Sequence, residues 1–164
     1  MNSKFLSPLT LLTILLFCPT AFAGEQEVLT ALSARDSLSP VGLNELEELA
    51  GSKEELIEIL LKYRRSETPP FVGIRSERIL LNYADNKEVM EALESDVNDA
   101  KYFGLARTIG THIDSVKDSS SRTRLATAVL KRAQTEKRFN MFGRILHESK
   151  DSEVKRLARE ANLK

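Results

Sequence analysis

The sequence contains few of the residues that most catalytic and redox sites require. Tryptophan is absent, histidine occurs only twice, and the single cysteine is Cys18, within an apolar N-terminal segment. If that segment is removed, the remaining chain has no cysteine, which excludes thiol catalysis and cysteine-ligated metals. Aromatic residues make up 6% of the chain, and alternating apolar runs are missing, so strand signals are few.

Motifs of catalytic and metal sites are missing as well. The sequence has no G-x-S-x-G, no glycine-rich phosphate loop and no H-E-x-x-H. His112 and His147, taken with Asp114 and Asp118, lack the spacing of metal ligands. We therefore expect no enzyme, no cofactor and no metal.

Pairs of acidic residues leave one catalytic alternative open, a carboxylate-dependent wall or lipid hydrolase. Two carboxyl groups flanking a bond are the usual machinery of glycoside cleavage. No feature selects one pair, because acidic residues are expected at helix N-termini in any case. The candidate pairs are Glu47 with Glu48, Glu54 with Glu55, and Asp96 with Asp99.

The N-terminal segment has the layout of a secretory signal peptide. Lys4 precedes a short apolar run over 9–17, and Ala21-Phe22-Ala23 follows as a small-residue cleavage site. The run is shorter than the roughly 20 residues of a membrane span, although a retained anchor is the alternative. A lipoprotein signal has a small residue before its cysteine, whereas bulky Phe17 precedes Cys18. We expect cleavage after Ala23, a single domain over 24–164, and the periplasm of a Gram-negative cell as its location, with secretion further out as the alternative.

Charge is balanced over the whole chain but unevenly distributed along it. Residues 24–99 hold 17 acidic and 8 basic residues, whereas residues 100–164 hold 15 basic and 7 acidic ones. Such asymmetry either gives two solvated faces or steers one end towards a partner of opposite charge. The most basic stretch, interleaved at its end with Phe139 and Phe142, contains the predicted partner-binding residues Arg122, Arg124, Lys131, Arg132, Lys137, Arg138 and Arg144.

Export argues against nucleic acid as the target of this basic stretch. We expect a protein with an acidic surface, and keep anionic lipid and wall polymer as alternatives. The alternative without a binding role is that these basic side chains are simply exposed to solvent on the outer faces of helices.

Apolar periodicity predicts helices along the whole domain. Ser52 and Glu55 form a capping box before the third helix, and Ser39-Pro40 suits the start of the second. In the fourth helix, Phe71, Ile74 and Leu81 are expected to face inward, with Val72 and Leu80 as further candidates. The expected helices cover 25–34, 40–50, 52–65, 70–84, a short segment after 86, 99–113, 122–133, 137–147 and 151–162.

The predicted helix over 99–113 is central, with an acidic turn before it. Its apolar stripe comprises Phe103, Ala106, Ile109, Gly110 and Ile113. Glycine destabilises a helix by roughly 1 kcal/mol relative to alanine. We therefore expect both glycines of this helix, at 104 and 110, to permit close approach of a neighbouring helix.

Helix pairs that begin near residues 40, 70, 99 and 137 predict stacked antiparallel hairpins, since periods of this size are typical of repeat proteins. The run Asp96-x-Asn98-x-x-x-Tyr102-x-x-Leu105-x-x-x-Ile109-Gly110 resembles a HEAT-type repeat, as does Asp151-x-Glu153-Val154-Lys155-x-x-Ala158-x-x-Ala161. Tyr102 and Leu105 stand where that family usually has arginine and alanine. The resemblance implies an all-α fold, a curved α-solenoid with a binding role; a compact orthogonal helical bundle is the alternative.

These observations together predict an exported, non-enzymatic helical-repeat protein that binds another protein in the cell envelope. One specific form of this hypothesis is an immunity protein or inhibitor against a periplasmic-acting toxin or hydrolase. An envelope scaffold or assembly factor is the alternative from a different class, besides the hydrolase named above.

Overall fold

A computed structural model describes residues 24–34, 42–68, 71–161 and 163, and these residues are helical with no strand among them. The prediction of an all-α fold is confirmed. The predicted signal peptide and the predicted Ser39-Pro40 helix start lie outside the described residues. The α-helices are α1 Glu25–Ser33, α2 Leu43–Ala50, α3 Lys53–Tyr63, α4 Val72–Leu80, α5 Lys87–Asn98, α6 Phe103–Thr111, α7 Ser119–Thr135, α8 Asn140–Ile145 and α9 Ser152–Glu160.

Short 3₁₀ turns extend or join several of these helices. They are η2 Leu81–Tyr83, η3 Ala100–Tyr102, η4 Ile113–Ser115, η5 Lys137–Phe139 and η6 Leu146–Glu148. Together with the α-helices they account for every helix that the sequence predicts in this part of the chain. None of the described helices combines the length and the apolar character that crossing a membrane would need.

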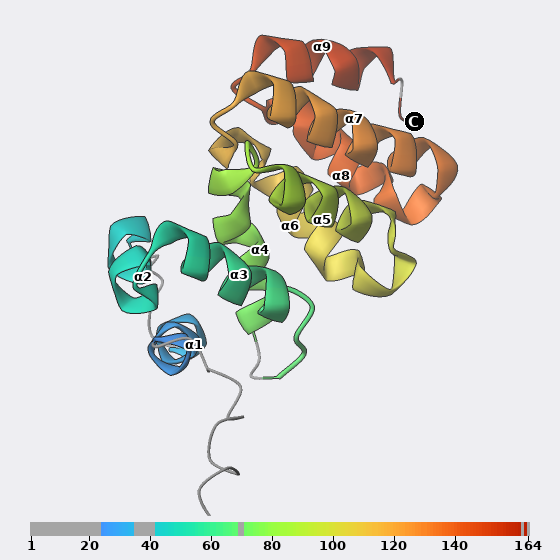
Figure 1. Ribbon diagram of the computed structural model, residues 1–164. Coiled ribbons are helices and arrows are strands. Elements are labelled where there is room, and N and C mark those ends of the chain that lie inside the picture. The colour runs from blue at the N-terminus through green and yellow to red at the C-terminus, as the bar shows by residue number, and fades with distance from the viewer. Residues whose placement is uncertain (1–23, 35–41, 69–70, 162, 164) are drawn as a thin grey trace, which may run out of the picture.

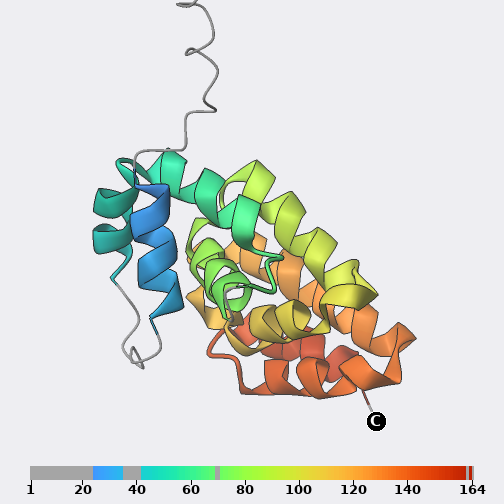
Figure 2. The same cartoon turned by 90° about the horizontal axis from the view of Figure 1, so that it is seen from below.

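The helices form two layers (Figures 1 and 2). The first layer contains α3, α5, α7 and α9, each packed against the next, and the second contains α4, α6 and α8 in the same order. Each of α3, α5 and α7 also packs against the helix that follows it in sequence, whereas α1 and α2 lie at the N-terminal end (Figure 1). The two layers are thus built from successive helix pairs, and the HEAT-type character of these pairs stays a prediction.

Side-chain caps fix where the first-layer helices begin. The Ser52 hydroxyl accepts a hydrogen bond from the Glu55 amide at 3.1 Å, as predicted. Asn86, Asp118 and Asp151 cap α5, α7 and α9 in the same way. The helix predicted over 122–133 therefore begins three residues earlier, at Ser119, because the Asp118 carboxylate accepts a hydrogen bond from the Ser121 amide at 2.7 Å.

The apolar stripe of the central helix is confirmed. Ala106, Ile109 and Ile113 are at most 3% exposed, and Phe103 packs against two aromatic rings of the α8 segment with centroids 4.8 and 5.1 Å away. A Cβ atom on Gly110 would lie 3.3 Å from the Phe142 Cβ, so this glycine does allow a close approach. For Gly104 that expectation is wrong, because a Cβ there meets nothing within 4 Å.

The register of α4 differs from the prediction. Phe71 and Ile74 are 58% and 43% exposed, whereas Val72 and Leu80 are fully buried, as Leu81 is. The buried face also contains Ser76 and Glu77. Close backbone packing sets this register: a Cβ on Gly73 would lie 2.7 Å from the carbonyl oxygens at positions 64 and 66. The predicted acidic turn at 96–99 also differs, because Asp96 is buried within α5 and only Asp99 begins the next turn.

Candidate functional site

The outer side of the second layer carries cations and almost no acidic side chains. Within α4, η3 with α6, and η5 with α8, the one carboxyl group is that of Glu77, which is buried. The nearest carboxylates in sequence, Glu67, Asp99 and Glu136, precede these segments. We call this surface the cationic face and define it by its exposed residues Phe71, Ile74, Arg78, Lys101, Arg107, Lys137, Arg138, Met141 and Arg144.

The same face contains the exposed large hydrophobic side chains of the described residues, Phe71, Ile74 and Met141. Met141 is 53% exposed and lies one helical turn after Lys137 and one turn before Arg144. Exposed apolar side chains among arginines are typical of protein interfaces, in which arginine, methionine and aromatic residues are enriched.

Three of the seven basic residues predicted from sequence belong to the cationic face, and a fourth is exposed elsewhere. Lys137, Arg138 and Arg144 are on the face, where Arg138 lies over the rings of Phe103 and Phe139 and pairs with Glu136 at 3.3 Å. Lys131 is exposed on α7, in the first layer.

The other three predicted residues make contacts within the protein. Arg122 donates to the Val116 carbonyl at 3.0 Å and pairs with Asp151 at 3.0 Å. Arg124 forms a two-pronged pair with Glu94 on α5, and Arg132 pairs with Glu136. These arginines join helices α5, α7 and α9 and the segments beside them.

Three further cations of the face, Arg78, Lys101 and Arg107, were not predicted as site residues. They are separated by up to 66 residues from Arg144 and become neighbours only because α4, α6 and α8 share one layer. The signal that could have revealed them is the absence of exposed acidic residues from these three segments.

A buried charged cluster lies between α3, α4 and α5. Asp96, fully buried, accepts hydrogen bonds from the Nε atoms of Arg64 at 2.9 Å and Arg65 at 2.5 Å. Arg65 also reaches Ser95 at 3.0 Å. Burial, reinforced by the Asp96 charge and opposed by the two arginines, raises the pKa of Glu77 well above its ordinary range. Burial therefore favours the protonated, neutral form of this carboxyl group.

A hollow of about 390 Å³ opens where α4 meets η3 and α6, beside this cluster. Its lining combines apolar side chains of the cationic face with Arg65, Lys101 and Tyr102. The ring of Tyr102 lies 4.6 Å from the Arg65 guanidinium and 5.1 Å from the Lys101 ammonium. We call this feature the α4–α6 hollow.

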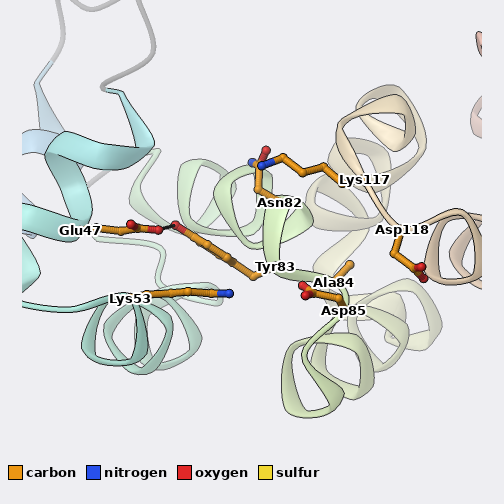
Figure 3. Close-up of a pocket in the computed structure, with 8 residues that line it drawn as sticks. All are labelled: Glu47, Lys53, Asn82, Tyr83, Ala84, Asp85, Lys117 and Asp118. Atoms are coloured by element: carbon orange, nitrogen blue, oxygen red, sulfur yellow. Dashed lines mark hydrogen bonds between the residues drawn. The ribbon is translucent and has the colours of Figure 1, made fainter.

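A second hollow, of about 420 Å³, has a mixed polar lining (Figure 3). The Tyr83 hydroxyl donates to Glu47 at 2.7 Å, and Lys53 lies 5.4 Å from the ring centroid. Burial and this hydrogen bond raise the pKa of Tyr83. Asp118, at the far side in Figure 3, serves as the cap of α7. These charged groups of the second hollow thus hold α2, α3 and α7 in place.

The residues considered for a metal site, among them His112 and Asp114, make separate contacts within the protein. Asp114 accepts hydrogen bonds from the Ser149 hydroxyl and the Lys150 amide, and burial together with the Arg78 charge lowers the pKa of His112. Among the described residues, no three His, Cys, Asp or Glu side chains are grouped to hold a metal ion.

Comparison with models of protein families, with curated proteins and with solved structures gave no match.

Proposed function

We propose that this chain is an exported, non-enzymatic protein that binds another protein of the cell envelope through the cationic face. The observation that carries the proposal is the joint occurrence, on one layer, of six exposed cations and the three exposed large hydrophobic side chains. The partner presents an acidic surface with apolar side chains, because this combination complements the face in both charge and hydrophobicity.

The charge asymmetry of the chain supports this choice of partner. Figure 1 places α1–α3 at one end of the molecule and α7–α9 at the other, so the acidic and basic parts of the sequence lie at different ends. A field of this kind steers an oppositely charged protein towards the basic end and raises the association rate.

In its specific form, the proposal makes the partner a periplasmic-acting toxin or hydrolase, and this chain its immunity protein or inhibitor. The support is the predicted signal peptide, the small size and the lack of a catalytic motif in the sequence, which is an argument by analogy. Deleting the gene should sensitise cells to a competitor that delivers the toxin, and an unchanged survival ratio would contradict this form.

Capture of the partner tests the general proposal. Tagged protein, purified with its cross-linked partners from envelope fractions and identified by mass spectrometry, should yield one dominant partner with an acidic surface. The face variant Arg78→Glu/Arg107→Glu/Arg144→Glu should lose that partner.

A matched control keeps the same change in net charge but places it elsewhere. Lys131→Glu/Lys150→Glu/Arg159→Glu alters three exposed cations on α7, before α9 and on α9. It should capture the partner as the wild type does, and circular dichroism should show equal helix content in all three proteins. Equal capture by the face variant would refute the proposal.

A further inference from the structure

The α4–α6 hollow has an apolar wall that is maintained at some energetic cost. Phe71 and Ile74, 58% and 43% exposed, line it, and nearly buried Leu105 forms part of its lining. Phe71 is the one non-glycine residue with a positive φ, 74°, in the described part of the chain. A bulky residue in this region of φ and ψ is strained, and such strain concentrates at ligand-binding positions. Because its ring stays largely exposed, Phe71 gains little burial energy to offset that strain.

The opposite wall is cationic and held in position. Arg65 is fixed by Asp96 and Ser95, and its guanidinium lies against the Tyr102 ring, with Lys101 5.1 Å from that ring. The lining itself contains three cations, Arg64, Arg65 and Lys101, and one acidic residue, Glu67. Behind it, Asp96 pairs with both arginines, and Asp99 pairs with Arg65 at 3.6 Å. The surface of the hollow is therefore predominantly cationic beside its apolar wall, with Lys101 at its edge.

Gly104 leaves the space above α6 open. It is exposed, it lines the hollow, and a Cβ built there meets no atom within 4 Å. The volume of about 390 Å³ falls within the range of about 300–1,000 Å³ that is typical of ligand pockets. A Cβ atom at position 104 would therefore project into this space without displacing any neighbouring atom.

We infer that the α4–α6 hollow is the anchor pocket of the cationic face and takes one apolar side chain of the partner protein, next to an Asp or Glu. The apolar side chain lies between Phe71, Ile74 and Gly104, and the neighbouring carboxylate meets Lys101 and Arg65. This inference rests on the proposed function, because it names the element of the partner that the face recognises. In many protein interfaces, a few buried apolar residues supply most of the binding energy, while charged pairs surround them at the rim.

Short peptides test the pocket directly, with the protein purified from cells that express the full chain. The probes are acetyl-Phe-Asp-amide and its charge-swapped counterpart acetyl-Phe-Lys-amide. They are added at about 1 mM and above, so that binding with a Kd of about 1 mM can be detected. The acidic peptide should shift the NMR amide signals of Ile74 and Gly104 in a saturable way and bind at least about tenfold more tightly than the basic one. No saturable shift at these residues, or equal shifts with both peptides, would overturn the inference.

Substitutions at one position separate pocket filling from loss of folding. Gly104→Phe should fill the hollow and abolish the peptide shifts, whereas Gly104→Ala adds only a Cβ and should retain them. Both variants should keep the helix content of the wild type. If the Gly104→Phe protein binds the peptide unchanged, the pocket lies elsewhere.

Partner capture distinguishes failure of this inference from failure of the proposed function. If the face variant loses the partner while Gly104→Phe retains it with wild-type affinity, the face binds protein but the hollow is not its anchor. If the protein ignores both peptides and instead binds vesicles of phosphatidylglycerol with phosphatidylcholine, the face recognises lipid and the inference is overturned.

Discussion

The buried carboxyl group of Glu77 makes the stability of the protein depend on pH. Its ordinary pKa is 4.5, and burial raises it in the folded state, helped by Asp96 and opposed by Arg64 and Arg65. Above pH 4.5 the unfolded chain releases this proton while the folded chain keeps it. The contribution of Glu77 is therefore fully present below pH 4.5 and is lost as pH rises towards the raised pKa.

We predict that Glu77→Gln removes this loss, because glutamine has a similar shape and does not ionise. The free energies of unfolding of the variant and the wild type should differ least at acidic pH. Between pH 4.5 and the raised pKa of Glu77, the difference should grow in favour of the variant by about 1.4 kcal/mol for each pH unit. Urea unfolding at about pH 4, 6 and 8 measures the difference. A difference that stays constant across these pH values would mean that Glu77 is already ionised in the folded protein.

Asp96→Asn should destabilise the protein strongly, because Asp96 joins the segment after α3 to α5. Its carboxylate contacts both Arg64 and Arg65, and the substitution removes the charge that offsets theirs, leaving Arg65 a longer pair with Asp99 at 3.6 Å. Breaking a buried pair from one side costs about 3–5 kcal/mol, and we expect the lower end because both arginines are partly exposed. Thermal unfolding measures it, with Glu94→Gln, which breaks the exposed pair with Arg124, as the control that should cost less than about 1 kcal/mol.

The helices of the two layers differ in how their N-termini are capped. In the first layer, a side chain caps each of α3, α5, α7 and α9. In the second layer, the N-cap residues of α4, α6 and α8 make no side-chain hydrogen bond to their helix; they are Phe71, Tyr102 and Phe139. The first layer thus has local start signals, and the second depends on packing against it.

The cap of α5 gives a direct test of a local start signal. Asn86 accepts hydrogen bonds from the amides of Glu88 and Val89 at 2.9 and 3.3 Å. Asn86→Ala should lower the free energy of unfolding by about 1 kcal/mol, whereas Asn86→Gly should lower it by only a few tenths. Chemical denaturation measures both, and equal losses would show that the side-chain oxygen does not cap the helix.

The two glycines of α6 should respond in opposite ways to the same substitution. Gly110→Leu meets Phe142 and should destabilise the protein by about 1–3 kcal/mol through overpacking. Gly104→Leu faces open space and should be neutral or stabilising, because glycine is unfavourable in a helix. Thermal unfolding of the pair checks the register of α6, and destabilisation of similar size at both positions would contradict it.

Much of this fold could be predicted from sequence because its signals are local. Ser52 and Glu55 predict the start of α3, and the apolar stripe around Ala106 predicts the buried side of α6. The register of α4 could not be predicted, because backbone packing at Gly73 places Phe71 and Ile74 outside. The cationic face was only partly predicted, since Arg78 and Arg107 join Arg144 through the layering of helices, which no local pattern contains.

The charge asymmetry of the whole molecule should govern the association rate of the partner. Salt screens charges over about 10 Å at 0.1 M and about 3 Å at 1 M. We therefore predict that the association rate falls steeply with ionic strength while the dissociation rate changes much less. Surface plasmon resonance with the captured partner measures both rates, and an association rate that does not depend on salt would exclude electrostatic steering.

We expect the partner to bind to the second layer, and not to the basic stretch as such. The most direct measurement compares the partner's Kd for the face variant with that for the control variant of equal net charge. We predict at least a tenfold loss for the face variant, about 1.4 kcal/mol or more, and wild-type affinity for the control. Equal weakening by both variants would show that net charge alone attracts the partner and would contradict a binding site on α4, α6 and α8.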